Sequence, residues 1–216
     1  MKKSLPWLML SGVLLLVSCA SKKDANEKNF SEALNSYFAK KGLICLGMAS
    51  TWPVDVNQRE RGTTVGTAPE MAILEKIGLV RSHETETEST PLFSTRPVKA
   101  RVLQYELTEE GKKFYREKGG GLAGNKEVRG DLCYGQQTLD KIIKWEGPTA
   151  AGDSEEASVF YTYKIANLAE WAKTPDIQRV FPGIVPTIDG AGKTVMNQAL
   201  TLTNQGWQAK ALDNPF

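Results

Sequence analysis

The chain offers few residues for catalysis. His83 is the one histidine in 216 residues, so a histidine-based nucleophilic triad or an imidazole general base would have to use it. Glu84, Glu86 and Glu88 follow at alternate positions and could orient the ring. The stretch is polar throughout, which is more typical of a solvated loop than of an active site. We therefore expect no catalytic residue around His83.

Two carboxylates occupy equivalent places in the two halves of the chain. Glu70 and Asp176 each follow a proline at the start of an expected helix. A facing pair of carboxylates could hydrolyse a glycosidic bond, and this alternative stays open. Acidic residues at such positions also complement the helix dipole.

Metal and phosphate sites are poorly supported. One histidine and two cysteines beyond Cys19 are too few for a zinc site. Residues 119–124 have the glycine spacing of a dinucleotide-binding turn but follow a charged segment instead of a strand. Residues 189–194 resemble the end of a phosphate-binding loop, yet Thr187 stands where the first glycine belongs. We expect a linker and a turn at these segments, and no cofactor.

The N-terminus carries an export signal. Lys2 and Lys3 precede an apolar stretch from Leu5 to Val17, 13 residues long, which is shorter than the roughly 17 to 25 residues of a membrane-spanning helix and suits a secretory signal. The stretch ends in Leu16-Val17-Ser18-Cys19, which resembles the lipobox of bacterial lipoproteins. The resemblance implies that residues 1–18 are a signal peptide and that Cys19 is diacylated and becomes the acylated N-terminus.

The residues after Cys19 bear on localisation. Ala20 and Ser21 follow it and no Asp does, which resembles lipoproteins of the outer membrane, with the folded part in the periplasm. The polar residues up to position 29 favour a flexible tether over 19–29. Export also predicts a disulfide between Cys45 and Cys133, because an even number of cysteines in an oxidising compartment favours pairing.

Charge excludes nucleic-acid binding. The chain has 27 basic and 25 acidic residues, and removal of Lys2 and Lys3 leaves a balance of zero. Residues 70–118 resemble the second half of a winged-helix domain, with a helix, a hairpin and a further helix. The expected wing contains Glu84, Glu86 and Glu88, where phosphate contact needs Lys or Arg. We expect the shape without the DNA-binding function.

Hydrophobic periodicity predicts an α+β protein of two related small subdomains, each a short antiparallel sheet with short helices. The subdomains are expected at 30–118 and 131–216, joined by a glycine-rich linker over 119–130. Three short segments, around Cys45, Pro69 and Thr108, have counterparts in the same order in the second half. They raise the hypothesis of an internal duplication.

Local signals place individual elements in this fold. Helices are expected at 30–40, with Ser31 as the N-cap, at 70–77, 109–118 and 175–180, and a hairpin is expected between 79–82 and 100–107. A turn is expected at 147–156, between a strand or helix near 137–146 and a strand at 157–165. Residues 181–186 are a second candidate for recognition, as an ordered loop with apolar tips, and a plain turn before a strand is the favoured interpretation.

Large aromatic side chains suggest a binding role. A cluster of exposed aromatics would mark a recognition face, and the candidates are Trp52, Trp145, Trp171, Phe181 and Trp207. Together with the thin supply of catalytic residues, they favour a non-enzymatic binding protein of the envelope, of the inhibitor or immunity type, with a protein partner. The alternative is a cell-wall hydrolase that uses carboxylates or serine.

Overall fold

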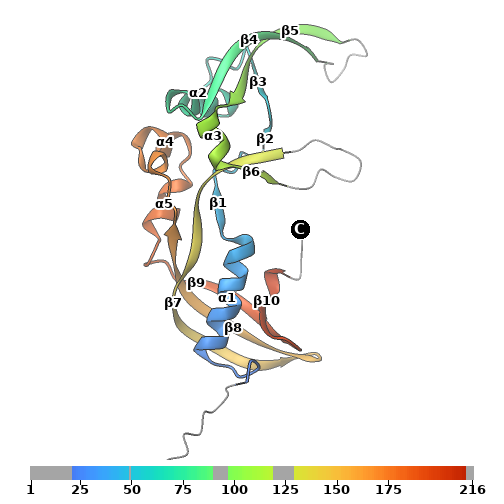
Figure 1. The fold of residues 1–216 in the computed structure, drawn as a ribbon, viewed down its shortest axis with the longest axis vertical. Helices are drawn as coiled ribbons and strands as arrows, with labels where there is room; N and C mark the ends of the chain where they lie inside the picture. Colours follow the sequence, from blue (N-terminus) through green and yellow to red (C-terminus); the bar gives the residue numbers. More distant parts are fainter. Residues whose placement is uncertain (1–20, 49, 90–96, 119–128, 213–216) are drawn as a thin grey trace, which may run out of the picture.

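The computed structural model describes residues 21–48, 50–89, 97–118 and 129–212, and Figure 1 shows their arrangement. The predicted signal peptide 1–18, Cys19 and the linker residues 119–128 lie outside the described residues. The helices and strands are, in chain order, α1 (Glu27–Lys41), β1 (Leu43–Cys45), β2 (Ser50–Thr51), β3 (Val54–Asn57), α2 (Thr67–Lys76), β4 (Val80–Ser89), β5 (Val98–Leu107), α3 (Glu109–Phe114), β6 (Tyr115–Lys118), β7 (Arg129–Ala151), β8 (Ser154–Ala166), the 3₁₀ helix η1 (Glu170–Lys173), α4 (Pro175–Val180), α5 (Ile184–Asp189), β9 (Met196–Thr203), β10 (Gly206–Ala209) and the 3₁₀ helix η2 (Lys210–Leu212). The predicted α+β class is confirmed.

The larger sheet is curled into half a barrel. Its strands follow the order β1-β7-β8-β9-β10, with β2 and β6 also paired to β7, and all of these pairs are antiparallel. Strand β7 is 23 residues long, and its register with β8 shifts at three places. Such bulges increase the local twist, which helps the sheet to curl. Residues 147–151 were predicted as part of a turn and instead continue β7.

Helix α1 fills the hollow of the curled sheet. Phe30, Leu34 and Phe38 are almost completely buried there. They pack against β8, β9 and β10, where Val159 and Trp207 belong to the same core. The first hydrophobic core of the molecule therefore joins an N-terminal helix to C-terminal strands.

The start of α1 differs from the prediction. The helix begins at Glu27, and the side chain of Asn26, not Ser31, caps it by accepting the backbone N–H of Asn29 at 2.9 Å. The Asn29 side chain in turn donates to the carbonyl oxygens of Ser21 and Asp24, both at 2.8 Å. Residues 21–29 are thus part of the folded domain, and the predicted tether is wrong for this segment.

The second hydrophobic core lies under the smaller sheet, which has the order β3-β5-β4. Met71 and Leu74 of α2 are fully buried against Val56, Leu79 and Tyr105. The predicted order of helix, hairpin and helix over 70–118 is present as α2, β4–β5 and α3, although α3 ends at Phe114 and β6 follows.

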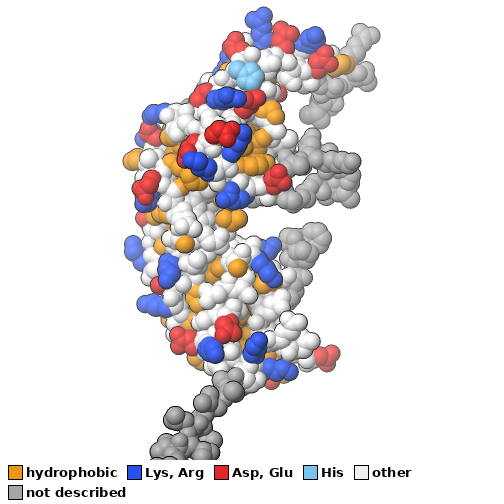
Figure 2. Space-filling view, in the orientation of Figure 1, with side chains coloured by type: hydrophobic (Ala, Val, Ile, Leu, Met, Phe, Trp, Pro, Cys, Tyr) orange, Lys and Arg blue, Asp and Glu red, His pale blue; other side chains and the backbone are white. Residues whose placement is uncertain are grey.

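The polar stretch around His83 is part of a strand and not the predicted loop. Strand β4 extends to Ser89, and its residues pair in register with β5. Cross-strand ion pairs favour this extension, with Arg81 to Glu106 at 3.0 Å and Arg101 to Glu86 at 3.8 Å. Figure 2 shows basic and acidic side chains side by side at this end of the molecule.

The two halves of the sequence do not fold as separate subdomains. Strands β1 and β2 from the first half pair with β7. The core around α2 also includes Leu132, Ile177 and Phe181 from the second half. The two sheets differ in strand number and order, so the structure does not show the hypothesised duplication. The predicted boundaries fail because β7 is long enough to belong to both cores.

The predicted disulfide is confirmed. Cys45 of β1 and Cys133 of β7 lie opposite each other in the sheet and are bonded. The bond ties the short strand β1 to the central strand of the larger sheet.

Candidate functional site: a groove at the free edge of β1

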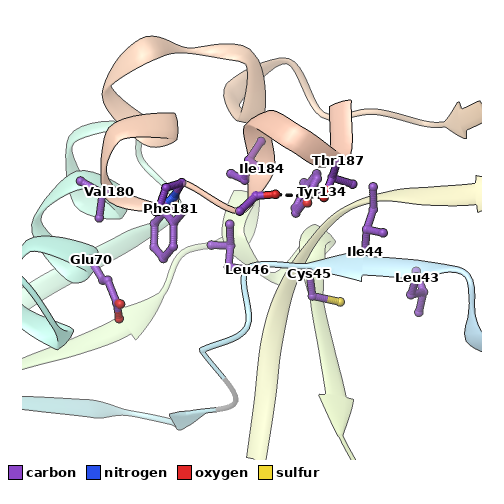
Figure 3. A pocket seen from close by; sticks show the side chains of 12 residues that line it. Leu43, Ile44, Cys45, Leu46, Glu70, Tyr134, Val180, Phe181, Ile184 and Thr187 are labelled. Atoms are coloured by element: carbon purple, nitrogen blue, oxygen red, sulfur yellow. Dashed lines mark hydrogen bonds between the residues drawn. The ribbon is translucent and has the colours of Figure 1, made fainter. Parts of the chain in front are cut away.

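A groove of about 470 Å³ opens beside the core around α2, and Figure 3 shows the side chains around it. One wall is strand β1 with Leu46, the other is the turn between α4 and α5, and Glu70 of α2 lies at one end. The lining residues are Leu43, Ile44, Cys45, Leu46, Glu70, Tyr134, Val180, Phe181, Pro182, Gly183, Ile184 and Thr187.

Strand β1 is the last strand on its side of the larger sheet. In the described part of the chain, β7 is its one strand neighbour. The Gln137 N–H donates to the Gly42 carbonyl at 2.7 Å, and the Leu46 N–H donates to the Leu132 carbonyl at 3.0 Å. Because successive residues of an antiparallel strand alternate in direction, the backbone groups of Leu43 and Cys45 point away from β7.

The opposite wall is built by the turn from α4 into α5. Phe181 ends α4 with its N–H on the Ile177 carbonyl at 2.8 Å, and Pro182 cannot continue the helix. Phe181 and Ile184 are anchored in the core, at 6% and 2% exposure, whereas Pro182 and Gly183 form an exposed rim. The sequence predicted a plain turn before a strand at 181–186; the structure instead begins α5 at Ile184.

The floor of the groove is polar at Tyr134 and Thr187. Burial raises the pKa of the Tyr134 phenol, and a hydrogen bond with Thr187 partly offsets that rise. The Thr187 hydroxyl also donates to the Gly183 carbonyl at 2.9 Å, and its own carbonyl accepts from the Tyr163 hydroxyl at 2.7 Å. These bonds hold the first turn of α5 against β7 and β8.

Glu70 is the one charged side chain among the described residues that line the groove. It lies in the first turn of α2 and is partly buried. Burial raises the pKa of its carboxyl group above the ordinary value, because desolvation disfavours the ionised form. A positive group brought to this end of the groove would stabilise the carboxylate.

The structure does not place Asp176 in the groove beside Glu70. The Asp176 carboxylate contacts the Lys76 ammonium at 2.6 Å and the Arg179 guanidinium at 3.1 Å. Its hydrogen bond and charge interaction with Lys76 lower its pKa. Glu70 and Asp176 therefore do not form the facing carboxylate pair that glycosidic hydrolysis would need, because Asp176 is paired with Lys76 and Arg179.

The five candidate aromatics do not form one face. Trp207 is buried, Trp145 is 38% exposed, and both contact Phe30 in the α1 core, at 5.0 and 5.5 Å between ring centroids. Trp52 packs edge-on against Tyr115, and Trp171 packs against Phe114 and Tyr134. Phe181 alone lines the groove. Trp52, Trp171 and Phe181 pack with the core around α2, whereas Trp145 and Trp207 contact the α1 core, so the five rings are divided between two cores.

His83 is exposed on β4, opposite Gln104, and is the pale blue side chain of Figure 2. Among the described residues, no three His, Cys, Asp or Glu side chains are grouped as a metal site would require. No helix within the same ranges has the length and apolar character of a membrane span.

Sequence reasoning missed the groove. The signal that could have found it is the short apolar run from Leu43 to Leu46 directly after the helix-ending Gly42, but its edge position depends on pairing with residues 133–136, far along the chain.

No known protein family, curated protein or solved structure matches this chain.

Proposed function

We propose that this chain is a lipid-anchored protein of the outer membrane whose folded part, in the periplasm, binds another envelope protein without catalysis, as inhibitor or immunity-type lipoproteins do. The observation that carries the proposal is the groove, in which a free strand edge faces an apolar wall with one charged residue. Such concave sites with few polar groups are typical of binding sites. The disulfide supports it, because bonded cysteines are typical of exported proteins.

The experiment is photo-crosslinking in living cells. A photoreactive phenylalanine analogue replaces Leu43, which lines the groove and is 49% exposed, or Val65, which is 79% exposed and lies outside it. We expect a single stoichiometric protein adduct from position 43, identified by mass spectrometry, and none from position 65. Equal adducts from both positions, or none from position 43, would contradict the proposal.

The alternative function is a cell-wall hydrolase, and the raised pKa of Glu70 favours it, because general-acid carboxyl groups have pKa values shifted in this direction. Glu70→Gln separates the two functions. For a hydrolase, the purified wild type would release soluble fragments from peptidoglycan and the variant would not. For a binding protein, neither releases fragments.

A further inference from the structure

We propose that the partner contributes an extended segment that pairs with β1 as an additional strand and places a Lys or Arg side chain beside Glu70. This inference rests on the proposed function and specifies how the groove recognises its partner. It commits to one occupant, a peptide segment of another protein with apolar residues at alternate positions and one basic residue.

The backbone of β1 is suited to such pairing. Gly42 and Leu46 hydrogen-bond to β7, so the alternation along β1 directs the N–H and carbonyl groups of Leu43 and Cys45 away from β7, even though the register of the pair shifts between Ile44 and Cys45. Alternate residues of a strand lie about 6.6 to 6.8 Å apart, the repeat of a neighbouring antiparallel strand. An added strand can therefore form two hydrogen-bonded residue pairs with β1, the basis of recognition by strand addition.

The edge of β1 carries no charged residue and no proline, although the strand is short and its register with β7 shifts between Ile44 and Cys45. Edge strands are usually protected by charged residues or proline, and β1 contains only Leu43, Ile44 and Cys45. The edge strand β4 of the smaller sheet differs, since Glu84, Glu86 and Glu88 alternate along it. The same molecule thus has a protected edge and an open one, and the open edge lies in the groove.

The opposite wall limits what can lie beside β1. Phe181 and Ile184 are packed into the core, so the wall is fixed before a partner arrives. Figure 3 shows the Ile44 and Leu46 side chains on the side of β1 that faces the α4–α5 turn, where Ile184 lies. An extended segment that pairs with β1 would present every second side chain to this apolar wall.

The charge of Glu70 indicates which type of residue the partner would place at this end of the groove. Glu70 has no compensating cation among the described lining residues. Desolvation of its carboxylate disfavours the ionised form, so a Lys or Arg of the partner at this point would gain a charge-assisted hydrogen bond in a partly buried site. An acidic residue at the same point would be repelled, which provides specificity.

The disulfide makes the added strand less costly to bind. Three residues form β1, and a strand this short would fray without support. The bond from Cys45 to Cys133 holds it in register with β7. A partner therefore meets a strand that is already ordered, which lowers the entropic cost of association.

The test is selection of phage-displayed random heptapeptides on the full chain, purified in detergent. We expect enriched peptides that alternate apolar with polar residues and include one Lys or Arg. N-methylation of alternate amides of a synthetic binder should weaken binding by about tenfold or more in one register, and by less than about twofold in the other, because only one register pairs with β1.

Two variants of this chain complete the test. Gly183→Trp adds a side chain at the rim of the groove, where a Cβ atom meets nothing within 4 Å, and should abolish binding. Gly62→Trp is the matched control, because Gly62 is equally open and lies outside the groove. Glu70→Gln should weaken binding of the selected peptide several-fold. The same substitution should have no effect on a peptide in which the basic residue is replaced by methionine.

Other outcomes would overturn the inference. They are no enrichment, equal effects of N-methylation in both registers, or equal effects of the two tryptophan variants. A dimer in sedimentation that Gly183→Trp disrupts would assign the edge to a second copy of this chain. If these tests fail while position 43 still crosslinks one protein in cells, strand addition is wrong and the binding function stands. If peptides bind as expected and no protein is crosslinked in cells, the groove accepts an added strand but the proposed envelope partner is wrong.

Discussion

At the residue scale, Gly111 in α3 has no room for a side chain. A Cβ atom at this position would lie 1.9 Å from the carbonyl oxygen of Leu79, and a backbone atom cannot move aside cheaply. We expect Gly111→Ala to lower the free energy of unfolding by about 2 kcal/mol or more, measured by urea denaturation. Gly62→Ala is the control, since nothing lies within 4 Å of its Cβ position, and should change stability by less than about 0.5 kcal/mol.

Tyr161 should make stability sensitive to alkaline pH. Burial in the α1 core raises the pKa of its phenol to about 12, with a smaller contribution from Tyr37, whereas an unfolded chain ionises near pH 10. Between these values the unfolded state has lost a proton that the folded state keeps, so stability falls as pH rises. Thermal unfolding from pH 9 to 11.5 should show a weaker decline in Tyr161→Phe. An unchanged slope would assign the effect to other groups.

At the scale of elements, the disulfide should determine whether β1 stays in place. The bond closes a loop with a sequence separation of 88, for which the chain-entropy model gives a stabilisation of about 4 kcal/mol. We expect Cys45→Ala/Cys133→Ala to lose about 2 to 4 kcal/mol in chemical denaturation. Hydrogen exchange should rise most at the N–H groups of Ile44 and Leu46. Uniform exchange changes across both sheets would mean that the bond does not act through β1.

The second prediction at this scale concerns the contact between Trp207 and the segment before α1. The Trp207 indole donates to the Lys23 carbonyl at 3.2 Å. Trp207→Phe keeps an aromatic ring against Phe30 and removes that donor. We expect faster proteolysis at residues 21–24, measured by limited trypsin digestion at Lys22 and Lys23. Trp145→Phe is the control, since Trp145 also contacts Phe30 and should leave the digestion rate unchanged.

Elements with local signals could be predicted, and elements fixed by distant partners could not. The spacing of Phe30, Leu34 and Phe38 identified α1, and the alternation along Val102 to Leu107 identified β5. The N-cap was misplaced because Asn26 lies in a polar run that has the composition of a tether. Strand β4 was predicted too short because its outer half is polar and depends on in-register pairing with β5, a partner that lies further along the chain.

At the scale of the whole molecule, the proposed membrane attachment would depend on Cys19. We expect Cys19→Ala to move the protein from the membrane to the soluble fraction, because stable anchoring requires more than one acyl chain. Fractionation followed by immunoblotting measures this. Ser18→Thr, which keeps the cysteine, is the matched control and should stay in the membrane fraction. A Cys19→Ala protein that sediments with membranes would contradict lipid anchoring.

The way in which the two halves of the chain pack together could not be predicted from the sequence. Repeated segments suggested two similar units, yet α1 packs on strands from the other end of the chain and β7 belongs to both cores. The groove exists only because β1, α2 and the α4–α5 turn meet across this arrangement. Of its lining residues, the sequence had singled out Cys45, Glu70 and the segment 181–186, each for a different reason.

The packing of residues 21–29 also bears on geometry at the membrane. With Ser21 already bonded to Asp24 and Asn29, a lipid on Cys19 would be joined to the folded body by two residues, a reach of at most about 7 Å. The α1 end of the long axis would then rest near the bilayer. Strand β1 and the α4–α5 turn, which line the groove, lie about midway along that axis in Figure 1 and would stand at a set height above the membrane. A partner would have to present its segment at that distance from the membrane. Proteins anchored in the same membrane whose segment lies at the same height would therefore be favoured over freely diffusing ones.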